Sequence, residues 1–163
     1  MSLKSLQLNT LKMKTLVIDG NNLIHRTFHT AKQQSKRTQT HAPQQVSNFH
    51  ILFTLNAVNS YVKQFVPDKT IIVWDEKKEY KINERKKVFE AYKGNRSKDL
   101  SPHENNEVIK SILLSMGINS IFPSRLEADD IVAYICKKHA GKKVVVSVDR
   151  DFLQLVSPEC TLY

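Results

Sequence analysis

Carboxylate side chains recur at the ends of apolar, β-branched runs and in the turns that follow them. Seven of the sixteen acidic residues occupy such positions: Asp19, Asp75, Glu127, Asp129, Asp130, Asp149 and Asp151. Two carboxylates about 4 Å apart repel by about 4 kcal/mol at an effective dielectric constant of about 20, so a converging group needs a cation to remain ionised. Oxygen ligands without cysteine or clustered histidine favour Mg²⁺ or Mn²⁺ over zinc. The acids therefore form a candidate divalent-metal site.

The rest of the chain is strongly basic. Its formal net charge is +9, and without the seven clustered acids the charge would rise by seven to +16. A surface of this sign favours a polyanion such as nucleic acid, although charge alone leaves open a ribosomal-type or simply soluble basic protein. A divalent-metal site in a basic protein indicates phosphodiester chemistry. In such chemistry, two ions about 3.5 to 4 Å apart activate the attacking water and stabilise the leaving 3′-oxygen.

Two segments carry much of the positive charge. Residues 77–98 contain nine Lys or Arg and three Glu, a net charge of +6, with Tyr80, Phe89 and Tyr92 interleaved. This mixture suits phosphate contacts combined with stacking on unpaired bases, although a solvated basic helix would have a similar composition. Residues 20–67 contain no acid, and their basic residues are Arg26, Lys32, Lys36, Arg37 and Lys63.

Buried strands are predicted where β-branched and apolar residues run together. The clearest runs are residues 15–19, 70–74 and 143–148, with a shorter one at 118–122. The sequence Gly-Asn-Asn at 20–22 predicts a turn, so the first strand is expected to lead into a functional loop. The last four residues, Cys-Thr-Leu-Tyr, are expected to begin a further strand.

Helices are predicted between these strands. After Pro43, apolar residues spaced by three and four predict an amphipathic helix with this face: Val46, Phe49, Phe53, Ala57 and Tyr61. Residues 101–104, Ser-Pro-His-Glu, predict a capping box with proline at the first helical position, and this helix is expected to end at Gly117. A third helix is predicted to begin at the acidic cluster 127–130, to carry Cys136 as a small core residue, and to stop near Gly141.

Alternating strands and helices predict an α/β fold with one mainly parallel sheet and helices on both faces. The carboxyl ends of the strands then share one edge, so Asp19, Asp75, Asp149 and the cluster at 127–130 become neighbours. Residues 15–163 are expected to form one domain after an extension at 1–14. Two cysteines, no secretory signal and no apolar run long enough to span a bilayer predict a cytoplasmic protein.

Four motifs, in order, resemble those of one family. They are Val17-Ile-Asp-Gly-Asn-Asn-Leu23, Glu90-Ala-Tyr-Lys-Gly-Asn-Arg96, Glu127-Ala-Asp-Asp-Ile131 and Ser147-Val-Asp-Arg-Asp-Phe152. The set is similar to that of the 5′-nuclease family of flap endonucleases and phage or bacterial 5′→3′ exonucleases, which is built on a PIN-like domain. The resemblance covers residues 16–155. It implies a PIN-like 5′-nuclease fold and cleavage of phosphodiesters at 5′ ends or junctions, in a bacterial or phage-infected cell.

The resemblance also implies roles for individual residues. The first metal ion would be held, directly or through waters, by Asp19, Asp75, Glu127, Asp129, Asp130 and Asp149. Asp130 would be essential for catalysis, and Asp151 would contribute to the site of the second ion. Lys93 and Arg96 match catalytic basic residues that face the scissile phosphate, and Tyr92 lies where a ring can stack on the terminal base. The remaining nucleic-acid contacts would come from Arg26 and from an arch or clamp containing Lys77, Lys78, Lys81, Arg85, Lys86 and Lys87.

Members of that family continue well beyond the length of this chain and supply two further metal-binding aspartates and an element that grips duplex DNA. Neither follows Tyr163, so the second metal site is expected to be incomplete in this chain. The chain is expected to be either a fragment or shortened form of a longer protein, or the first polypeptide of a split nuclease whose partner is a separate C-terminal polypeptide. The leading hypothesis is a Mg²⁺- or Mn²⁺-dependent 5′ nuclease. It would act on 5′-flap or junction DNA and on RNA–DNA hybrids, in primer or flap removal. A non-catalytic nucleic-acid-binding half of a split nuclease and a PIN-type ribonuclease remain open.

Overall fold

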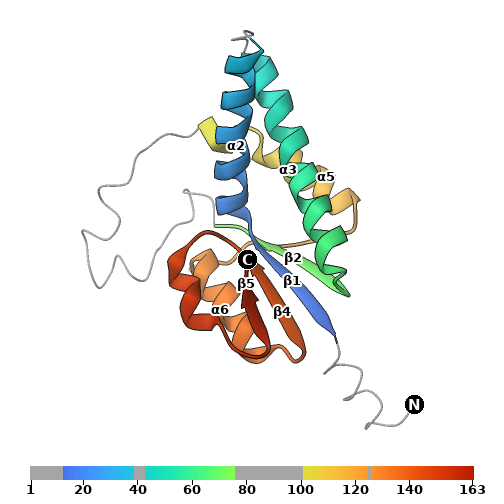
Figure 1. Cartoon of the computed structure of the whole chain (residues 1–163), viewed down its shortest axis with the longest axis vertical. Coiled ribbons are helices and arrows are strands. Elements are labelled where there is room, and N and C mark those ends of the chain that lie inside the picture. The colour runs from blue at the N-terminus through green and yellow to red at the C-terminus, as the bar shows by residue number, and fades with distance from the viewer. Residues whose placement is uncertain (1–12, 39–42, 76–100, 125) are drawn as a thin grey trace, which may run out of the picture.

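The computed structural model describes residues 13–38, 43–75, 101–124 and 126–163, which adopt an α/β arrangement (Figure 1). Neighbouring strands of the single sheet pair in parallel, in the order β3-β2-β1-β4-β5. The strands are β1 (Lys14–Asp19), β2 (Lys69–Val73), β3 (Asn119–Ile121), β4 (Lys142–Val146) and β5 (Cys160–Leu162). The parallel α/β fold predicted from the sequence is confirmed, including the strand begun by the last residues.

Helices cover both faces of the sheet (Figure 1). One face packs against α2 (Gly20–Arg37), α3 (Pro43–Phe65) and α5 (Asn106–Ser115). The other packs against α6 (Ala128–Lys138) and the 3₁₀ helix η3 (Arg150–Leu155), and a short 3₁₀ helix, η2 (Ser101–His103), precedes α5. Within the described residues, no helix is long and apolar enough to cross a membrane.

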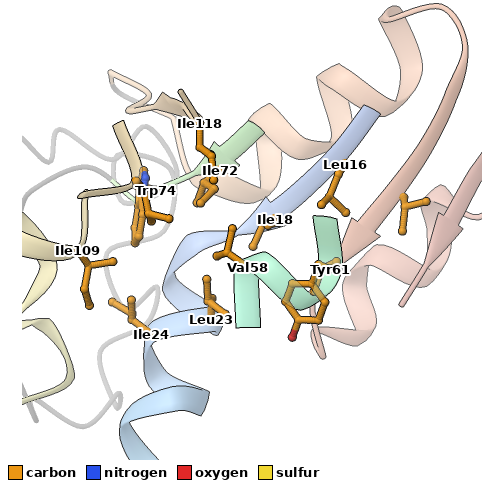
Figure 2. Close-up of a cluster of buried hydrophobic side chains, with 13 residues drawn as sticks. Leu16, Ile18, Leu23, Ile24, Val58, Tyr61, Ile72, Trp74, Ile109 and Ile118 are labelled. Carbon is orange, nitrogen blue, oxygen red and sulfur yellow. The ribbon is translucent and has the colours of Figure 1, made fainter. Parts of the chain in front are cut away.

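The two cores follow from the alternation of side chains along β1. Leu16 and Ile18 pack with side chains of α2, α3 and α5 (Figure 2). Val17 points to the opposite face and packs with α6 and η3. Because the central strand is buried on both faces, it reads as an unbroken apolar run in the sequence.

Helix α2 begins directly at the end of β1. Asp19 is the N-cap residue, and its carboxylate accepts a hydrogen bond from the amide N of Asn22. The turn predicted at residues 20–22 is therefore wrong, because an N-cap aspartate lets the helix start at once. Gly20 is required at this start, since a Cβ atom there would lie only 2.5 Å from Cε3 of the buried Trp74.

The start of α5 also differs from expectation. Residues 101–103 form η2, and Asn105 is the N-cap residue of α5, so the predicted capping box does not open this helix. The Asn105 side chain instead accepts from Ser47 Oγ at 2.6 Å and donates to His50 Nδ1 at 3.2 Å. The predicted end is confirmed: Gly117 has a φ of 78°, and its amide N donates to the Leu114 carbonyl at 2.9 Å.

Cys136 lies on α6 and packs against the core formed with η3, as predicted for a small core residue. Burial raises the pKa of its thiol to about 12, and the neighbouring Cys160 thiol adds to this effect. The thiol is therefore protonated at neutral pH and behaves as an apolar group.

The order of the strands reverses between β1 and β4. From β1 the chain builds outward through β2 to β3, and it then returns to the other side of β1 for β4 and β5. In an open parallel sheet, ligands bind at such a point, outside the carboxyl ends of the strands. β4 ends at Val146, which leaves Ser147 and Val148 outside the strand and in contact with residues that follow β1 or end it.

Candidate active site

Asp19 lies at the carboxyl end of β1, at the point where the strand order reverses. It is 8% exposed. One carboxylate oxygen accepts from the amide N of Asn22 at 3.0 Å, and the other accepts from Ser147 Oγ at 2.9 Å. The first bond holds the start of α2 and the second holds the segment after β4. Asp19 therefore joins the start of α2 to the segment after β4, at the point where the strand order reverses.

Asp75 follows the end of β2 and links the starts of two helices. Its Oδ2 accepts from Nδ2 of Asn21 at 2.7 Å, and its Oδ1 accepts from the amide N of Ala128 at 3.0 Å. The amide N of Asp75 also donates to Oδ1 of Asn21 at 3.4 Å. These bonds bring the acidic first turn of α6 to the same edge of the sheet as Asp19.

The acidic cluster 127–130 forms the beginning of α6. Glu127 is a buried N-cap residue whose side chain accepts from the amide of Asp130, and the amide N of Glu127 donates to Oδ2 of Asp130 at 3.1 Å. Asp129 and Asp130 are partly buried in the first turn. This reciprocal capping explains why acids open the helix, while the bond from Ala128 to Asp75 explains where the cluster lies.

Asp149 and Asp151 lie just beyond β4, at the start of η3. Asp149 is the N-cap residue, and its Oδ1 accepts from the amide N of Asp151 at 2.9 Å. The amide N of Asp149 donates to Ser147 Oγ at 3.1 Å. Asp149 is partly buried and Asp151 is exposed. The Ser147 hydroxyl group thus bridges the backbone amide of Asp149 and the carboxylate of Asp19.

Asp19, Asp75 and Asp149 come from the ends of three strands and form one electrostatic group. Burial raises the pKa of Asp19 above its usual range, and the charges of Asp75 and Asp149 raise it further. The hydrogen bonds from Asn22 and Ser147 lower this pKa and offset part of the rise. Within the described ranges, no three Asp, Glu, His or Cys side chains are grouped so that they could hold a metal ion.

Arg26 lies on α2, about two turns beyond Asp19. Its guanidinium donates to the hydroxyl of Tyr61, and its Cζ lies 6.0 Å from the centroid of the Tyr61 ring. The side chain is thus held against α3. The other predicted nucleic-acid contacts lie outside the described residues: Lys77, Lys78, Lys81, Arg85, Lys86, Lys87, Tyr92, Lys93 and Arg96.

Three polar residues that orient the acids were not assigned a role from the sequence. Asn21 binds Asp75, the side chain of Asn22 accepts from the amide N of Val148 at 3.4 Å, and Ser147 binds Asp19. The signal was present, because each of the three lies within two or three residues of a candidate acid. Short polar side chains after a strand also fit a turn, which is how the Asn pair was interpreted.

Comparison with known proteins identifies relatives over nearly the whole chain. Residues 14–163 match the family described as the 5′–3′ exonuclease, N-terminal resolvase-like domain. Flap endonuclease Xni of Shewanella sediminis is 33% identical over 147 residues, which cover 88% of this chain and 52% of the relative. The 5′–3′ exonuclease of Aquifex aeolicus is 33% identical over 152 residues, which cover 89% and 49%, respectively. The chain thus spans about half the length of the curated relatives it matches.

Solved structures share the fold at lower sequence identity. The T5 5′-exonuclease with bound divalent zinc has a TM-score of 0.63 at 18% identity, over 92% of this chain and 54% of that one. A bacteriophage T5 flap endonuclease in a pseudo-enzyme–product complex with DNA and metal ions has a TM-score of 0.57 at 16% identity, with the same coverage. The match over residues 14–163 shows that this chain belongs to the family of 5′–3′ exonuclease N-terminal resolvase-like domains.

Proposed function

We propose that this chain is the catalytic part of a metal-dependent 5′ nuclease that hydrolyses phosphodiesters at 5′ ends and at junctions of single-stranded and duplex DNA. The observation that carries the proposal is the meeting of Asp19, Asp75 and Asp149 at the carboxyl ends of β1, β2 and β4, where the pKa of Asp19 is raised. Membership of the exonuclease family and the 33% identity to flap endonuclease Xni support the same reaction.

The donor chemistry fits a hard divalent cation, because the acidic group presents carboxylate oxygens. A cation would relieve the repulsion that Asp75 and Asp149 exert on Asp19. No group of three described side chains could hold the ion alone, so water would complete its shell, and Mg²⁺ keeps several waters in proteins. We propose that one Mg²⁺ or Mn²⁺ ion is held, directly or through its waters, by Asp19, Asp75, Glu127, Asp129, Asp130 and Asp149, and a second by Asp151 with further ligands.

When bound, such ions polarise the reacting phosphate and lower the pKa of coordinated water. The chain itself fixes the carboxylates that receive them. Ser147 and the Asn22 amide orient Asp19, and Asn21 and the Ala128 amide orient Asp75. Each of these hydrogen bonds leaves further lone pairs on the carboxylate oxygens for a ligand. The acids are thus preorganised before substrate binds, which is the main source of electrostatic catalysis.

Basic and aromatic residues are proposed to bind the substrate strand. Arg26 would contact a phosphate, since the Tyr61 hydroxyl uses only part of the donor capacity of its guanidinium. Lys93 and Arg96 would face the scissile phosphate and Tyr92 the terminal base. An arch or clamp would contain Lys77, Lys78, Lys81, Arg85, Lys86 and Lys87. These nine residues lie outside the described part of the chain, so their roles rest on the motifs and charge of residues 77–98.

The proposed substrates are DNA with a 5′ flap or a junction, and RNA–DNA hybrids such as a primer on its template. The matched region covers about half of each cited relative, and we also propose that a C-terminal part acts with this chain, either within the same protein or as a separate polypeptide. The proposed location is the cytoplasm of a bacterial or phage-infected cell.

Cleavage of an internally labelled 5′-flap duplex in Mg²⁺ tests the proposal. The Asp129→Asn, Asp130→Asn double variant should lower the cleavage rate by at least about 100-fold, because several kcal/mol of charge stabilisation would be lost with the ions. Its affinity for the flap in EDTA should stay near that of the wild type. Asp68→Asn is the matched control: Asp68 accepts from the amide N of Lys14 at the opposite edge of the sheet, and asparagine keeps an acceptor there.

Full cleavage by the double variant would contradict the assigned centre. A second candidate function, a non-catalytic nucleic-acid-binding half, is favoured by the lack of any three-residue metal group among the described side chains. Tight flap binding by the wild type with no cleavage in Mg²⁺ or Mn²⁺ would support that second function instead.

A further inference from the structure

An exposed aromatic ring lies at the same edge of the sheet as the acidic site, after β3, the strand that neighbours β2. Phe122 immediately follows β3 and is 51% exposed. Its ring is nearly parallel to that of Trp74, with an angle of 9° between the planes and 6.5 Å between the centroids. The amide N of Trp74 donates to the carbonyl of Ile121 at 2.9 Å, and this bond places Trp74 and Phe122 side by side at the ends of neighbouring strands. Trp74 directly precedes Asp75, so Phe122 lies at the carboxyl edge of the sheet.

The inner side of this pair is rigid. Trp74 is 1% exposed and packs in the core with α5 (Figure 2), and its Nε1 donates to Ser120 Oγ at 3.2 Å. The missing side chain of Gly20 leaves the space that the Trp74 ring fills. The ring of Phe122 is therefore stacked against a fixed support, and its exposed surface is turned to solvent.

A lysine is held against both rings. Lys110 Nζ lies 4.8 Å from the Phe122 centroid and 5.2 Å from the Trp74 centroid, and its side chain is only 13% exposed. Its ion pair with the exposed Glu107 is long, at 3.4 Å. The cation–π contacts fix the plane of Phe122 and bring positive charge to the ring. We call Trp74, Phe122 and Lys110 the ring platform.

Scattered apolar side chains on a surface need no explanation, but this one has three further properties. Its ring continues a parallel stack, it has a lysine ammonium close to its ring, and it lies at the same edge of the sheet as the acids proposed to cut nucleic acid. A nucleotide of the substrate strand matches all three properties: its base offers a flat π-face for the ring, its phosphate suits the positive charge, and its strand is what the acids are proposed to cut. A rigid aromatic residue also loses little conformational freedom when a base stacks on it.

We propose that the ring platform binds one unpaired nucleobase of the substrate strand by stacking it on Phe122. This site deepens the proposed nuclease function and rests on it. Stacking recognises the π-face that every base has, so the platform would select an unpaired base without selecting its identity. It would thereby position the strand relative to Asp75 and the other acids, and Phe122 would be a substrate-positioning residue.

Abasic scanning of a 5′-flap duplex tests this proposal by binding alone, in EDTA. In the wild type, a single abasic position in the unpaired strand should weaken binding by about 5- to 150-fold, the range expected for one base stacked on an aromatic ring. In Phe122→Ala, binding of the intact flap should weaken similarly, and the abasic penalty at that position should disappear. Phe122→Tyr should keep the penalty, whereas Phe122→Leu should lose it, since leucine is apolar but has no π-face.

Tyr134→Leu is the matched control, because Tyr134 is an exposed aromatic residue of α6, on the other face of the sheet. It should leave the abasic profile unchanged. Unchanged far-ultraviolet circular dichroism shows that each variant is folded, since the emission of Trp74 would itself respond to the loss of the Phe122 ring stacked on it. An identical abasic profile in the wild type and in Phe122→Ala would overturn the platform alone. If the wild type binds no flap, both the ring-platform proposal and the proposed nucleic-acid role are wrong. If it binds the flap without Mg²⁺-dependent cleavage, only the proposed nuclease activity is wrong.

Discussion

Asp19 has two tasks with opposite electrostatic requirements. As the N-cap residue of α2 it faces free amides and the positive end of the helix dipole, which favour its charge. As a buried residue near Asp75 and Asp149, it is in surroundings that disfavour the same charge, and the net result is a raised pKa. An ionisable residue in surroundings that disfavour its charge is characteristic of a functional site, since asparagine would cap the helix equally well.

The Asp19→Asn variant should therefore be more stable than the wild type at neutral pH in EDTA, while its Mg²⁺-dependent cleavage should fall by at least about 100-fold. A raised pKa means that the folded state binds the proton more tightly than the unfolded state does. The resulting loss of folding stability is absent below the usual aspartate pKa of about 3.9. It grows as the pH rises from there through the raised pKa of the folded state, and it is constant above that pKa. In urea denaturation from pH 3.5 to 7.5, the difference in the free energy of unfolding between the variant and the wild type should increase as the pH rises. A gap of the same size at both ends would contradict the assigned cause.

At the scale of elements, His50 joins three helices through its two ring nitrogens. Its Nε2 donates to the carbonyl of Ile24 in α2 at 3.1 Å, and its Nδ1 accepts from Nδ2 of Asn105, the residue at the N-cap position of α5. This pattern requires a neutral ring. Burial lowers the pKa of His50, and His25 and His103 lower it further, against the bond to Ile24, which raises it.

The stability of the wild type should fall as the pH drops below the usual histidine value of about 6.5, since the unfolded state then binds a proton that folded His50 resists. His50→Gln should be less stable than the wild type at pH 8 by about 1 to 3 kcal/mol, because Ile24 and Asn105 lose ideal partners. Its free energy of unfolding should also depend less steeply on pH, by up to about 1.4 kcal/mol per pH unit. His29→Gln, at an exposed position of α2, gives the baseline for the loss of one imidazole. Equal slopes in wild type and His50→Gln would show that His50 is not the group responsible.

The elements also show where sequence reasoning succeeds and where it fails. The strands were predictable because a strand buried on both faces must be an unbroken apolar run, as in β1 and β4. The convergence of acids followed from parallel topology alone. The starts of α2 and α5 were not predictable from local composition, because the side chains of the N-cap residues Asp19 and Asn105 bind partners far along the chain, Ser147 and Ser47. For the same reason, the roles of Asn21 and Ser147 emerged only from tertiary contacts.

At the scale of the whole molecule, the acids of the candidate site are separated from the basic end of α2 along the direction of the strands. The acids gather at the carboxyl edge of the sheet, where α2 begins, and α2 and α3 extend away from that edge as a pair (Figure 1). Residues 20–67 contain no acid, and α2 ends in the exposed Lys36 and Arg37. Because α2 has 18 residues, its basic end lies about 27 Å from the acids along the helix axis. A bound strand could thus follow a positive surface away from the site.

Lys36 and Arg37 should therefore contribute to the salt dependence of flap binding. The Lys36→Gln, Arg37→Gln double variant should lower the slope of log K against log[salt] by about 0.7 to 0.9 for each phosphate that is no longer neutralised, with little change in cleavage at saturating substrate. Lys137→Gln, Lys138→Gln is the matched control, since it removes the same charge from the last turn of another helix. Helix α6 starts beside Asp75 and ends before β4 begins, so its basic end lies at the opposite edge of the sheet. Binding titrations from 50 to 200 mM KCl should leave the slope of the control unchanged. A larger decrease of the slope in the control would place the nucleic acid along α6 and not along α2.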